Sequence, residues 1–315
     1  MQLLPGFSKN IIQWYHLNKR DLPWRNTNDP YKIWVSEIIL QQTRVLQGLP
    51  YYERFIATFP TVHDLAKAPI DQVLRLWQGL GYYSRARNMH VAAQYVSLEL
   101  HGHFPSNFDS LLKMKGVGRY TAAAIASFAY KEKVAVVDGN VQRVLSRIFG
   151  ISEDISLPKT QKTFEVLAQK HISDAHPDQF NQAIMEFGAT YCMPHNPECN
   201  ACIFKIACFA HNHTMVDKLP VKARKTKVKN RFIHYIVFQY GNQLAMKQRN
   251  EKDIWNGLFD FYLIESENEM QEFELNEHMK IFNVIEKPPY KVSNTFRHLL
   301  SHQRLHVKFY HYLVN

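Results

Sequence analysis

All four cysteines of the 315-residue chain lie in one short segment, as Cys192, Cys199, Cys202 and Cys208. Their C-x6-C-x2-C-x5-C spacing brings four thiols within reach of one metal centre, and the inner C-x2-C pair can bind neighbouring metal positions. Zinc sites more often consist of two C-x2-C pairs separated by a longer loop. The spacing therefore favours an iron–sulfur cluster over zinc. Disulfide bonds, or four ordinary buried thiols, would also be compatible with this grouping.

A glutamate within an apolar helix is a candidate for acid–base chemistry. Glu37 lies in the stretch IWVSEIIL (33–40), so apolar side chains surround it on nearly all sides. A carboxyl group buried there resists ionisation and holds a proton near neutral pH, as a general acid must. The alternative is a structural glutamate paired with Arg44 or another basic residue. Because buried unpaired acids are rare, we favour the functional interpretation.

A second acid follows the apolar stretch VAVV. Asp138 occupies the expected N-cap of a helix over 139–149, where the helix dipole keeps a carboxylate ionised. Taken alone, this residue is best explained as a helix cap. Together, Glu37 and Asp138 suggest the arrangement that cleaves glycosidic bonds. One carboxyl group protonates the leaving group, and the other stabilises the positive charge that develops on the sugar.

Two glycine-containing turns suit contacts with nucleic acid. In KGVGR (115–119), glycines let backbone N–H groups approach a phosphate, although a tight turn between helices is the alternative. Tyr82 and Tyr83 lie between a turn at 79–81 and two arginines, Arg85 and Arg87. An aromatic wedge beside phosphate-binding arginines suits insertion into a base stack, and half-buried packing tyrosines are the alternative.

The composition is consistent with a nucleic-acid partner. Lys plus Arg exceed Asp plus Glu by 38 − 28 = +10, which predicts a polyanionic partner, although a solvated basic surface is the alternative. No run of eighteen apolar residues and no secretory leader is present, so we expect no membrane span. The confinement of cysteine to one segment suits a reducing compartment, the cytoplasm, with nucleoid association in a bacterium.

The hydrophobic pattern indicates two domains. From Asn10 to about Ala210 it is helical, with one helix expected from Pro30 through residues 31–47 and a helix, hairpin and helix over 106–130. A basic linker follows at 214–230. After it the period becomes alternating, with a hairpin over 232–249 and a strand over 304–314. We therefore expect a mainly α domain followed by a smaller α+β domain.

Several motifs are shared with a known family: LPWR (22–25), SEIILQQTRV (36–45), GLGYYSRARN (79–88), GVGRYTAAAI (116–125), VVDGNVQRV (136–144) and FNQAIMEFGATYC (180–192). With the cysteine segment, they resemble the helix-hairpin-helix DNA glycosylases that hold a 4Fe–4S cluster, and more narrowly the MutY-type adenine DNA glycosylases. IWNGLFDFYLIE (254–265) and TFRHLLSH (295–302) resemble the Nudix-like recognition domain of that family.

This resemblance implies a fold and its domain boundaries. A two-lobed helix-hairpin-helix glycosylase domain is expected over 1–213, with a 4Fe–4S loop at 192–208. The linker at 214–230 leads to a Nudix-like lesion-recognition domain over 231–315. That domain ends earlier than is usual in the family, so we expect a truncated or reduced recognition domain. The stretch after Gly257 lacks the acidic catalytic helix of Nudix hydrolases, so this domain should bind and not cleave.

The resemblance also implies a role for each matching residue. Glu37 corresponds to the acid that protonates adenine, and Asp138 to the carboxylate that stabilises the oxocarbenium-like state. The other assignments are Tyr120 and Asn140 beside these acids, Arg25 and Glu186 in the adenine pocket, Gln42 and Tyr82 near the orphaned lesion base, Gly116, Val117, Gly118 and Arg119 on the DNA, Ser301 and His302 at 8-oxoguanine, and Cys192, Cys199, Cys202 and Cys208 on the cluster.

The implied activity is base excision by a monomer on duplex DNA. Adenine mispaired with 8-oxoguanine or guanine would be flipped out and its glycosidic bond hydrolysed, leaving an abasic site. Endonuclease III-like relatives have a Schiff-base lysine at position 120, whereas this chain has Tyr120, which favours a monofunctional glycosylase. The alternatives are an endonuclease III-like pyrimidine glycosylase and lyase, a non-catalytic mismatch-binding protein, and a zinc-stabilised DNA-binding regulator.

Two residues depart from the family pattern. Lys115 occupies a hairpin position that usually holds proline, which makes the turn less rigid and adds a positive charge. Leu300 replaces the usual phenylalanine before Ser301 and His302, which removes an aromatic contact to the lesion. We therefore expect a weaker preference for 8-oxoguanine over guanine than in relatives.

Overall fold

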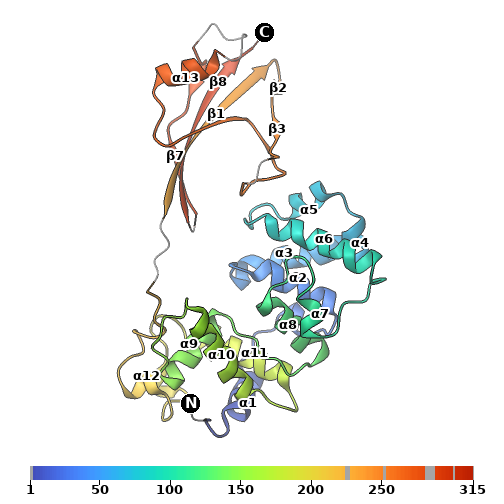
Figure 1. Ribbon diagram of the computed structural model, residues 1–315, viewed down its shortest axis with the longest axis vertical. Coiled ribbons are helices and arrows are strands. Elements are labelled where there is room, and N and C mark those ends of the chain that lie inside the picture. The colour runs from blue at the N-terminus through green and yellow to red at the C-terminus, as the bar shows by residue number, and fades with distance from the viewer. Residues whose placement is uncertain (1–2, 224–227, 251–252, 281–287, 301, 315) are drawn as a thin grey trace. The chain divides into compact units, whose positions relative to one another are not determined.

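A computed structural model describes residues 3–223, 228–250, 253–280, 288–300 and 302–314 (Figure 1). The chain forms two compact units, Met1–Ala223 and Arg224–Asn315. The first unit is helical and the second contains the strands. In the described part of the chain, no helix combines the length and the apolar character needed to cross a bilayer.

The helical unit has two lobes. In one, α2 packs against α3 and α8, and α4 and α5 pack against α6; in the other, α9 contacts α10, α11 and α12, and α1 packs on α11. Its elements are α1 Phe7–Asn18, η1 Pro23–Arg25, α2 Pro30–Leu40, α3 Val45–Thr58, α4 Val62–Lys67, α5 Ile70–Leu76, α6 Ser84–Leu98, α7 Phe108–Leu111, α8 Arg119–Tyr130, α9 Gly139–Phe149, α10 Pro158–His171, α11 Pro177–Thr190, η2 Cys199–Ala201 and α12 Phe209–Asn212.

The helix expected over 31–47 is two helices. α2 begins as predicted, with Asp29 as N-cap accepting a hydrogen bond from the Tyr31 N–H at 2.9 Å and Pro30 in the first turn. It ends at Leu40, and Gln42 adopts a left-handed backbone with φ 58°. Tertiary hydrogen bonds to the carbonyls at the end of α2 compensate for this break, so helical propensity alone does not determine the boundary.

The helix, hairpin and helix over 106–130 are α7, a tight turn and α8. Asn107 caps α7 by accepting a hydrogen bond from the Ser110 N–H at 2.9 Å. Gly116 in the turn has φ 77°, and a Cβ there would lie 2.7 Å from the Cβ of Asn88. Glycine is therefore required at this position by both backbone conformation and space.

Part of the segment expected to be a linker belongs to the helical unit. Leu219 is 2% exposed in the core of the second lobe, and Met215, Val216 and Val221 pack against that core. The carbonyls of Val216 and Leu219 accept hydrogen bonds from Arg147 at 3.0 and 3.1 Å. The boundary between the units thus lies after Ala223 and not at residue 213.

The second unit is built on two long strands, β1 (Lys229–Tyr240) and β8 (Gln303–Leu313), which lie parallel to each other. Antiparallel to β1 lie β2 (Gln243–Leu244) and β5 (Tyr262–Ser266); antiparallel to β8 lie β6 (Lys291–Val292) and β7 (Phe296–Leu299). A separate two-stranded sheet pairs β3 (Lys247–Gln248) with β4 (Phe259–Asp260). Helix α13 (Glu272–Met279) contributes Leu275 and Met279 to a core with Ile236 and Tyr310.

Acidic side chains of this second unit are neutralised by two buried arginines. Arg231 pairs with Asp253 and Glu265, and Arg249 pairs with Asp253 and Asp260. Carboxylates held in this way are not free to bind a divalent cation.

Candidate active site

A cavity of about 180 Å³ lies within the helical unit. It is enclosed by η1, α2, the first turn of α3, α8, the start of α9 and α11. Six residues assigned from the sequence to catalysis or adenine binding line it together: Arg25, Glu37, Tyr120, Asp138, Asn140 and Glu186. Residues that are up to 161 positions apart in the chain thus face one space.

Glu37 is buried, with 6% of its surface exposed. Burial, which is the largest effect, and the nearby Asp138 raise the pKa of Glu37 to about 7, although a hydrogen bond from the Tyr120 hydroxyl opposes this rise. Arg44, the partner considered from the sequence, is exposed, and none of the ion pairs among the described residues includes Glu37. The Glu37 carboxyl group therefore keeps its proton to a higher pH than an exposed glutamate does, up to about pH 7.

Asp138 is the N-cap of α9 and accepts two hydrogen bonds from N–H donors. The Val141 N–H contacts Oδ1 at 2.8 Å, and the Asn140 side-chain amide contacts Oδ2 at 2.8 Å. Burial, which is the largest effect, leaves the pKa of Asp138 above its usual value, although these donors and Arg143 lower it. Because both oxygens accept hydrogen bonds from N–H groups, the local geometry suits the carboxylate form.

The Glu186 carboxylate accepts hydrogen bonds from two arginines. The Arg25 guanidinium contacts its Oε2 at 2.7 Å, and Arg20 contacts both oxygens at 2.7 and 2.6 Å. Burial alone would raise the pKa of Glu186, but the hydrogen bonds from Arg20 and Arg25 outweigh it and lower the pKa to about 2. Glu186 is therefore an ionised residue that orients Arg25 at the cavity, whereas Glu37 is the carboxyl group with the raised pKa.

Arg20 and Gln182 also line this cavity and were not identified as site residues from the sequence. Arg20 is part of the Glu186 ion pair, and Gln182 accepts a hydrogen bond from the Tyr15 hydroxyl at 2.6 Å. A signal for Gln182 was present, because it precedes Glu186 by four residues on α11 and so lies on the same helix face. Arg20 gave no such signal, since it lies in a loop.

The residues expected to contact DNA differ in their exposure and in their backbone conformation. Gln42 and Tyr82 are exposed and have left-handed backbones, with φ 58° and 48°. A Cβ at Gly118 would meet nothing within 4 Å, so its backbone is open to a close ligand. Val117 is 6% exposed and fills the inside of the hairpin. A role for Val117 on DNA would therefore be limited to its backbone.

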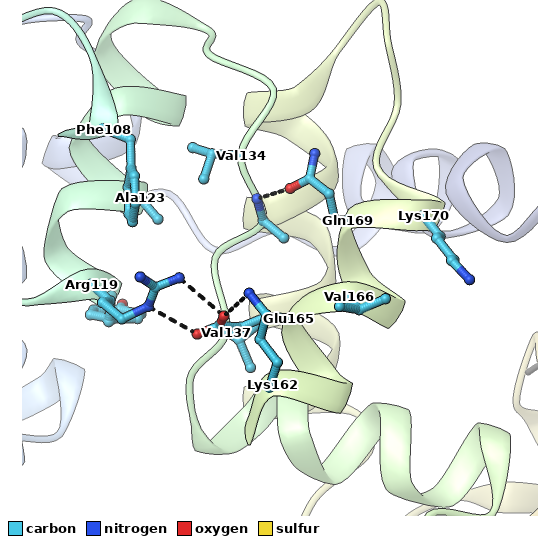
Figure 2. A pocket seen from close by; sticks show the side chains of 12 residues that line it. Phe108, Arg119, Ala123, Val134, Val137, Lys162, Glu165, Val166, Gln169 and Lys170 are labelled. Carbon is cyan, nitrogen blue, oxygen red and sulfur yellow. Dashed lines mark hydrogen bonds and ion pairs between the residues drawn. The ribbon is translucent and has the colours of Figure 1, made fainter. Parts of the chain in front are cut away.

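Arg119 is engaged with another side chain, as Figure 2 shows. Its guanidinium contacts both carboxylate oxygens of Glu165 on α10, at 3.2 and 3.1 Å, and Lys162 lies 3.5 Å from the same carboxylate. These residues line a second cavity of about 320 Å³, next to Tyr120. Neither Glu37 nor Asp138 lines this larger cavity, whereas both line the smaller one.

All four cysteines are free thiols. The Phe204 N–H contacts the Cys202 Sγ at 3.4 Å, and the buried Arg147 guanidinium contacts the Cys192 Sγ at 3.5 Å, as donors to metal-bound thiolates do. Across the described residues, no three cysteine, histidine or carboxylate side chains form a site for a single ion. Four cysteine thiols, two of which accept hydrogen bonds from N–H groups, have the chemistry that a 4Fe–4S cluster needs from its ligands.

Comparisons with known proteins identify the family. Residues 35–170 match the HhH-GPD superfamily base excision DNA repair proteins, and residues 234–315 match the NUDIX domain. The adenine DNA glycosylase of Buchnera aphidicola subsp. Schizaphis graminum is 35% identical over 96% of this chain and 86% of its own length. The chain belongs to the adenine DNA glycosylases.

Another relative and a solved structure are consistent with membership of this family. The rat enzyme is 46% identical over 68% of this chain and 43% of its own length. The solved structure of a thermostable thymine-DNA glycosylase is 30% identical and superimposes with a TM-score of 0.61, covering 66% of this chain and 95% of the other. These comparisons confirm the fold expected from the sequence, a helix-hairpin-helix glycosylase followed by a small Nudix-like domain. They also confirm the prediction that the protein is an enzyme of base excision repair.

In this adenine DNA glycosylase, an arginine connects the cysteine segment with the catalytic residues. Arg143 donates to the carbonyl of Cys192 at 2.9 Å, to the carbonyl of Gly188 at 2.7 Å and to the Asn140 Oδ1 at 2.8 Å. Asn140 in turn donates to Asp138. The cysteine segment is thus connected through Arg143 to Asn140, the side chain that donates to the Asp138 carboxylate.

Of the two residues assigned to lesion recognition, His302 lies between β7 and β8. Ser301 lies outside the described residues. His302 is partly exposed, and its carbonyl accepts a hydrogen bond from the Lys229 N–H at 3.0 Å. Leu300 packs against a core formed by Ile233, Tyr235 and Leu305. An apolar side chain at position 300 therefore helps hold this turn against the sheet.

Proposed function

We propose that this enzyme removes adenine mispaired with 8-oxoguanine or guanine in duplex DNA and leaves an abasic site. The observation that carries the proposal is that two acids in one cavity have different environments. Glu37 has a pKa of about 7, and Asp138 accepts hydrogen bonds from N–H donors. A cavity of about 180 Å³ suits a single nucleobase that has been flipped out of the duplex.

In the proposed mechanism, Glu37 donates its proton to a ring nitrogen of adenine. The glycosidic electron pair leaves with the protonated base, and the sugar becomes oxocarbenium-like. The Asp138 carboxylate stabilises this positive charge, with Asn140 fixing its orientation. Water adds to the sugar carbon and loses its proton, so the products are adenine and an abasic site. Arg25, oriented by Glu186, lines the adenine pocket.

The enzyme is proposed to be monofunctional. Tyr120 lies at the cavity, hydrogen-bonded to Glu37, and it has no amine that could form a Schiff base with the abasic sugar. Strand cleavage by β-elimination therefore has no nucleophile at this position. Borohydride should not trap a covalent adduct at the rate of base release.

Cys192, Cys199, Cys202 and Cys208 are proposed to bind a 4Fe–4S cluster. When bound, the cluster would fix the segment 192–208 and would supply no acid or base to hydrolysis, because all four thiols are its ligands. Lys205 is exposed in this segment and suits a DNA phosphate. Elemental analysis of the purified protein should find iron and not zinc.

The activity should fall as pH rises through about 7, because the acid form of Glu37 is required. The pKa of Glu37 is raised, so its proton is present below that pH and is lost above it. The Tyr120 hydrogen bond lowers this pKa, so the alkaline limb should move to higher pH in Tyr120→Phe. Profiles of kcat/KM for base release in the two proteins measure the shift. A limb that stays in place or moves to lower pH would contradict the assignment.

Glu165→Gln should strengthen DNA binding, because it releases Arg119 from an ion pair and removes a negative charge beside the hairpin. We expect affinity to rise by about two- to fivefold at low salt, with a steeper salt dependence. Glu53→Gln, at an exposed position on α3, removes the same charge elsewhere and is the matched control. Weaker binding by Glu165→Gln would show that Glu165 holds Arg119 in its binding position.

One assay tests the proposed function directly. Purified protein is incubated with duplexes carrying adenine opposite 8-oxoguanine, adenine opposite guanine, or an oxidised pyrimidine. We expect free adenine from the first two duplexes and strand cleavage only after alkali treatment. Release of the oxidised pyrimidine with strand cleavage would identify the endonuclease III-like alternative, and binding without release would identify a mismatch-binding protein. Because the proposed substrate is duplex DNA, we propose that the activity is located in the cytoplasm, at the nucleoid if the protein is bacterial.

A further inference from the structure

Two exposed loops of the helical unit carry the residues expected to enter DNA. Gln42 lies between α2 and α3, and Tyr82 lies just before α6. Both residues have φ angles in the left-handed region, 58° and 48°, which non-glycine residues rarely adopt. Such conformations persist only where surrounding contacts hold them. The contacts that hold these two loops are therefore part of how the enzyme examines DNA.

One guanidinium joins the two loops. Arg85, in the first turn of α6, donates five hydrogen bonds, and all of them go to backbone carbonyl oxygens at 2.6–3.2 Å. The acceptors are Ile38, Ile39 and Gln41 for Nη1, and Leu80 and Gly81 for Nη2. The first three carbonyls end the helix that carries Glu37, and the other two form the turn before Tyr82.

The surroundings of Arg85 favour this connection. The guanidinium lies 5.1 Å from the centre of the Trp77 ring and 5.8 Å from that of Tyr82. Trp77 itself donates its indole N–H to the carbonyl of Gly81 at 3.0 Å. Burial lowers the pKa of Arg85 to about 10, so the group stays charged at neutral pH. A cation at the carboxyl end of α2 also complements the helix dipole.

We propose that Arg85 is a positioning residue that holds the Gln42 loop and the Tyr82 loop in one arrangement and ties both to helix α2. This inference rests on the proposed function, because it gives the two loops their role on DNA. It replaces the expectation that Arg85 binds phosphate. Both terminal nitrogens already donate to carbonyls, and Nε is buried without a partner among the described residues.

The geometry requires arginine and not only a positive charge. A guanidinium is a planar fork whose two terminal nitrogens reach separate groups of acceptors. A lysine ammonium is a single point with three donors, and it cannot contact both loops at once. Arg85→Lys therefore separates the two explanations, since it keeps the charge but removes the fork.

The test compares binding to two duplexes. One carries 2′-fluoro-adenosine, which resists hydrolysis, opposite 8-oxoguanine; the other is fully matched. In Arg85→Gln and in Arg85→Lys, the preference for the mispair should fall by about tenfold while affinity for the matched duplex stays the same. Arg75→Gln, at an exposed position on α5, removes the same charge and should keep the preference.

Each outcome bears on the proposal. A preference retained by Arg85→Lys but lost in Arg85→Gln would show that only charge matters, and would overturn it. Equal loss of affinity for both duplexes in the two variants would also overturn it, because that result indicates a phosphate contact or a damaged fold. If Arg85→Gln does not fold, Arg85→Lys alone decides. If the wild-type protein itself shows no preference for the mispair, the proposed function fails first.

Discussion

Glu37→Gln should abolish adenine release while binding to the mispair survives. Glutamine has nearly the same shape and stays neutral, so the packing around α2 is preserved, but it has no acidic proton to give to the leaving base. General acid catalysis contributes about 10²- to 10⁴-fold, so a loss in that range is expected in the single-turnover rate. Measurement with enzyme in excess over an adenine:8-oxoguanine duplex isolates this step from product release.

A matched binding measurement accompanies this experiment. The dissociation constant for the same duplex should change by no more than about threefold, since the energy of binding comes from the DNA backbone and the inserted side chains. Equal losses of binding and rate would mean that Glu37 is a structural residue. A rate that remained within about tenfold of wild type would mean that another group protonates the base.

Asp138→Asn should cause the second large loss. The Asn side-chain oxygen can still accept the hydrogen bond from the Val141 N–H, so the cap of α9 is retained and the fold should persist. What disappears is the negative charge that faces the developing oxocarbenium. Removal of one such electrostatic contact costs about 10²- to 10³-fold in rate. The single-turnover rate measures this loss, and the melting temperature serves as the control for folding.

The double variant Glu37→Gln, Asp138→Asn adds a further check. The two acids serve one transition state, so their effects should be less than additive. A product of the two single losses would instead show that the two acids contribute independently of each other. A melting temperature far below that of wild type in Asp138→Asn would mean that the residue mainly caps the helix.

Several expectations from the sequence depended on local patterns and agree with the structure. The N-cap at Asp29, the hairpin with Gly116, the cap at Asp138 and the two long strands all follow from residue types a few positions apart. Propensity, capping and turn chemistry act over such distances. The prediction of one helix over 31–47 was wrong because it used local patterns only. The break at Gln42 depends on Arg85, which lies forty-three residues later in the chain.

Partners distant in the chain determined what individual side chains do. Glu186 was assigned to the adenine pocket, but its ionisation depends on Arg20 and Arg25 from the start of the chain. Arg119 was assigned to DNA, and the structure pairs it with Glu165 on another helix. Such pairings arise from packing between elements, which no local pattern encodes.

The sequence by itself determined which chemical groups this adenine DNA glycosylase possesses. Two acids, four grouped thiols and a tyrosine without an amine at position 120 are properties of the residues, whatever their surroundings. Only the tertiary structure decided that Glu186 is ionised, because its pKa depends on hydrogen bonds from Arg20 and Arg25, which lie near the start of the chain. Only the structure, likewise, connected the Gln42 and Tyr82 loops through Arg85, since a fork of hydrogen bonds needs acceptors from separate segments to converge.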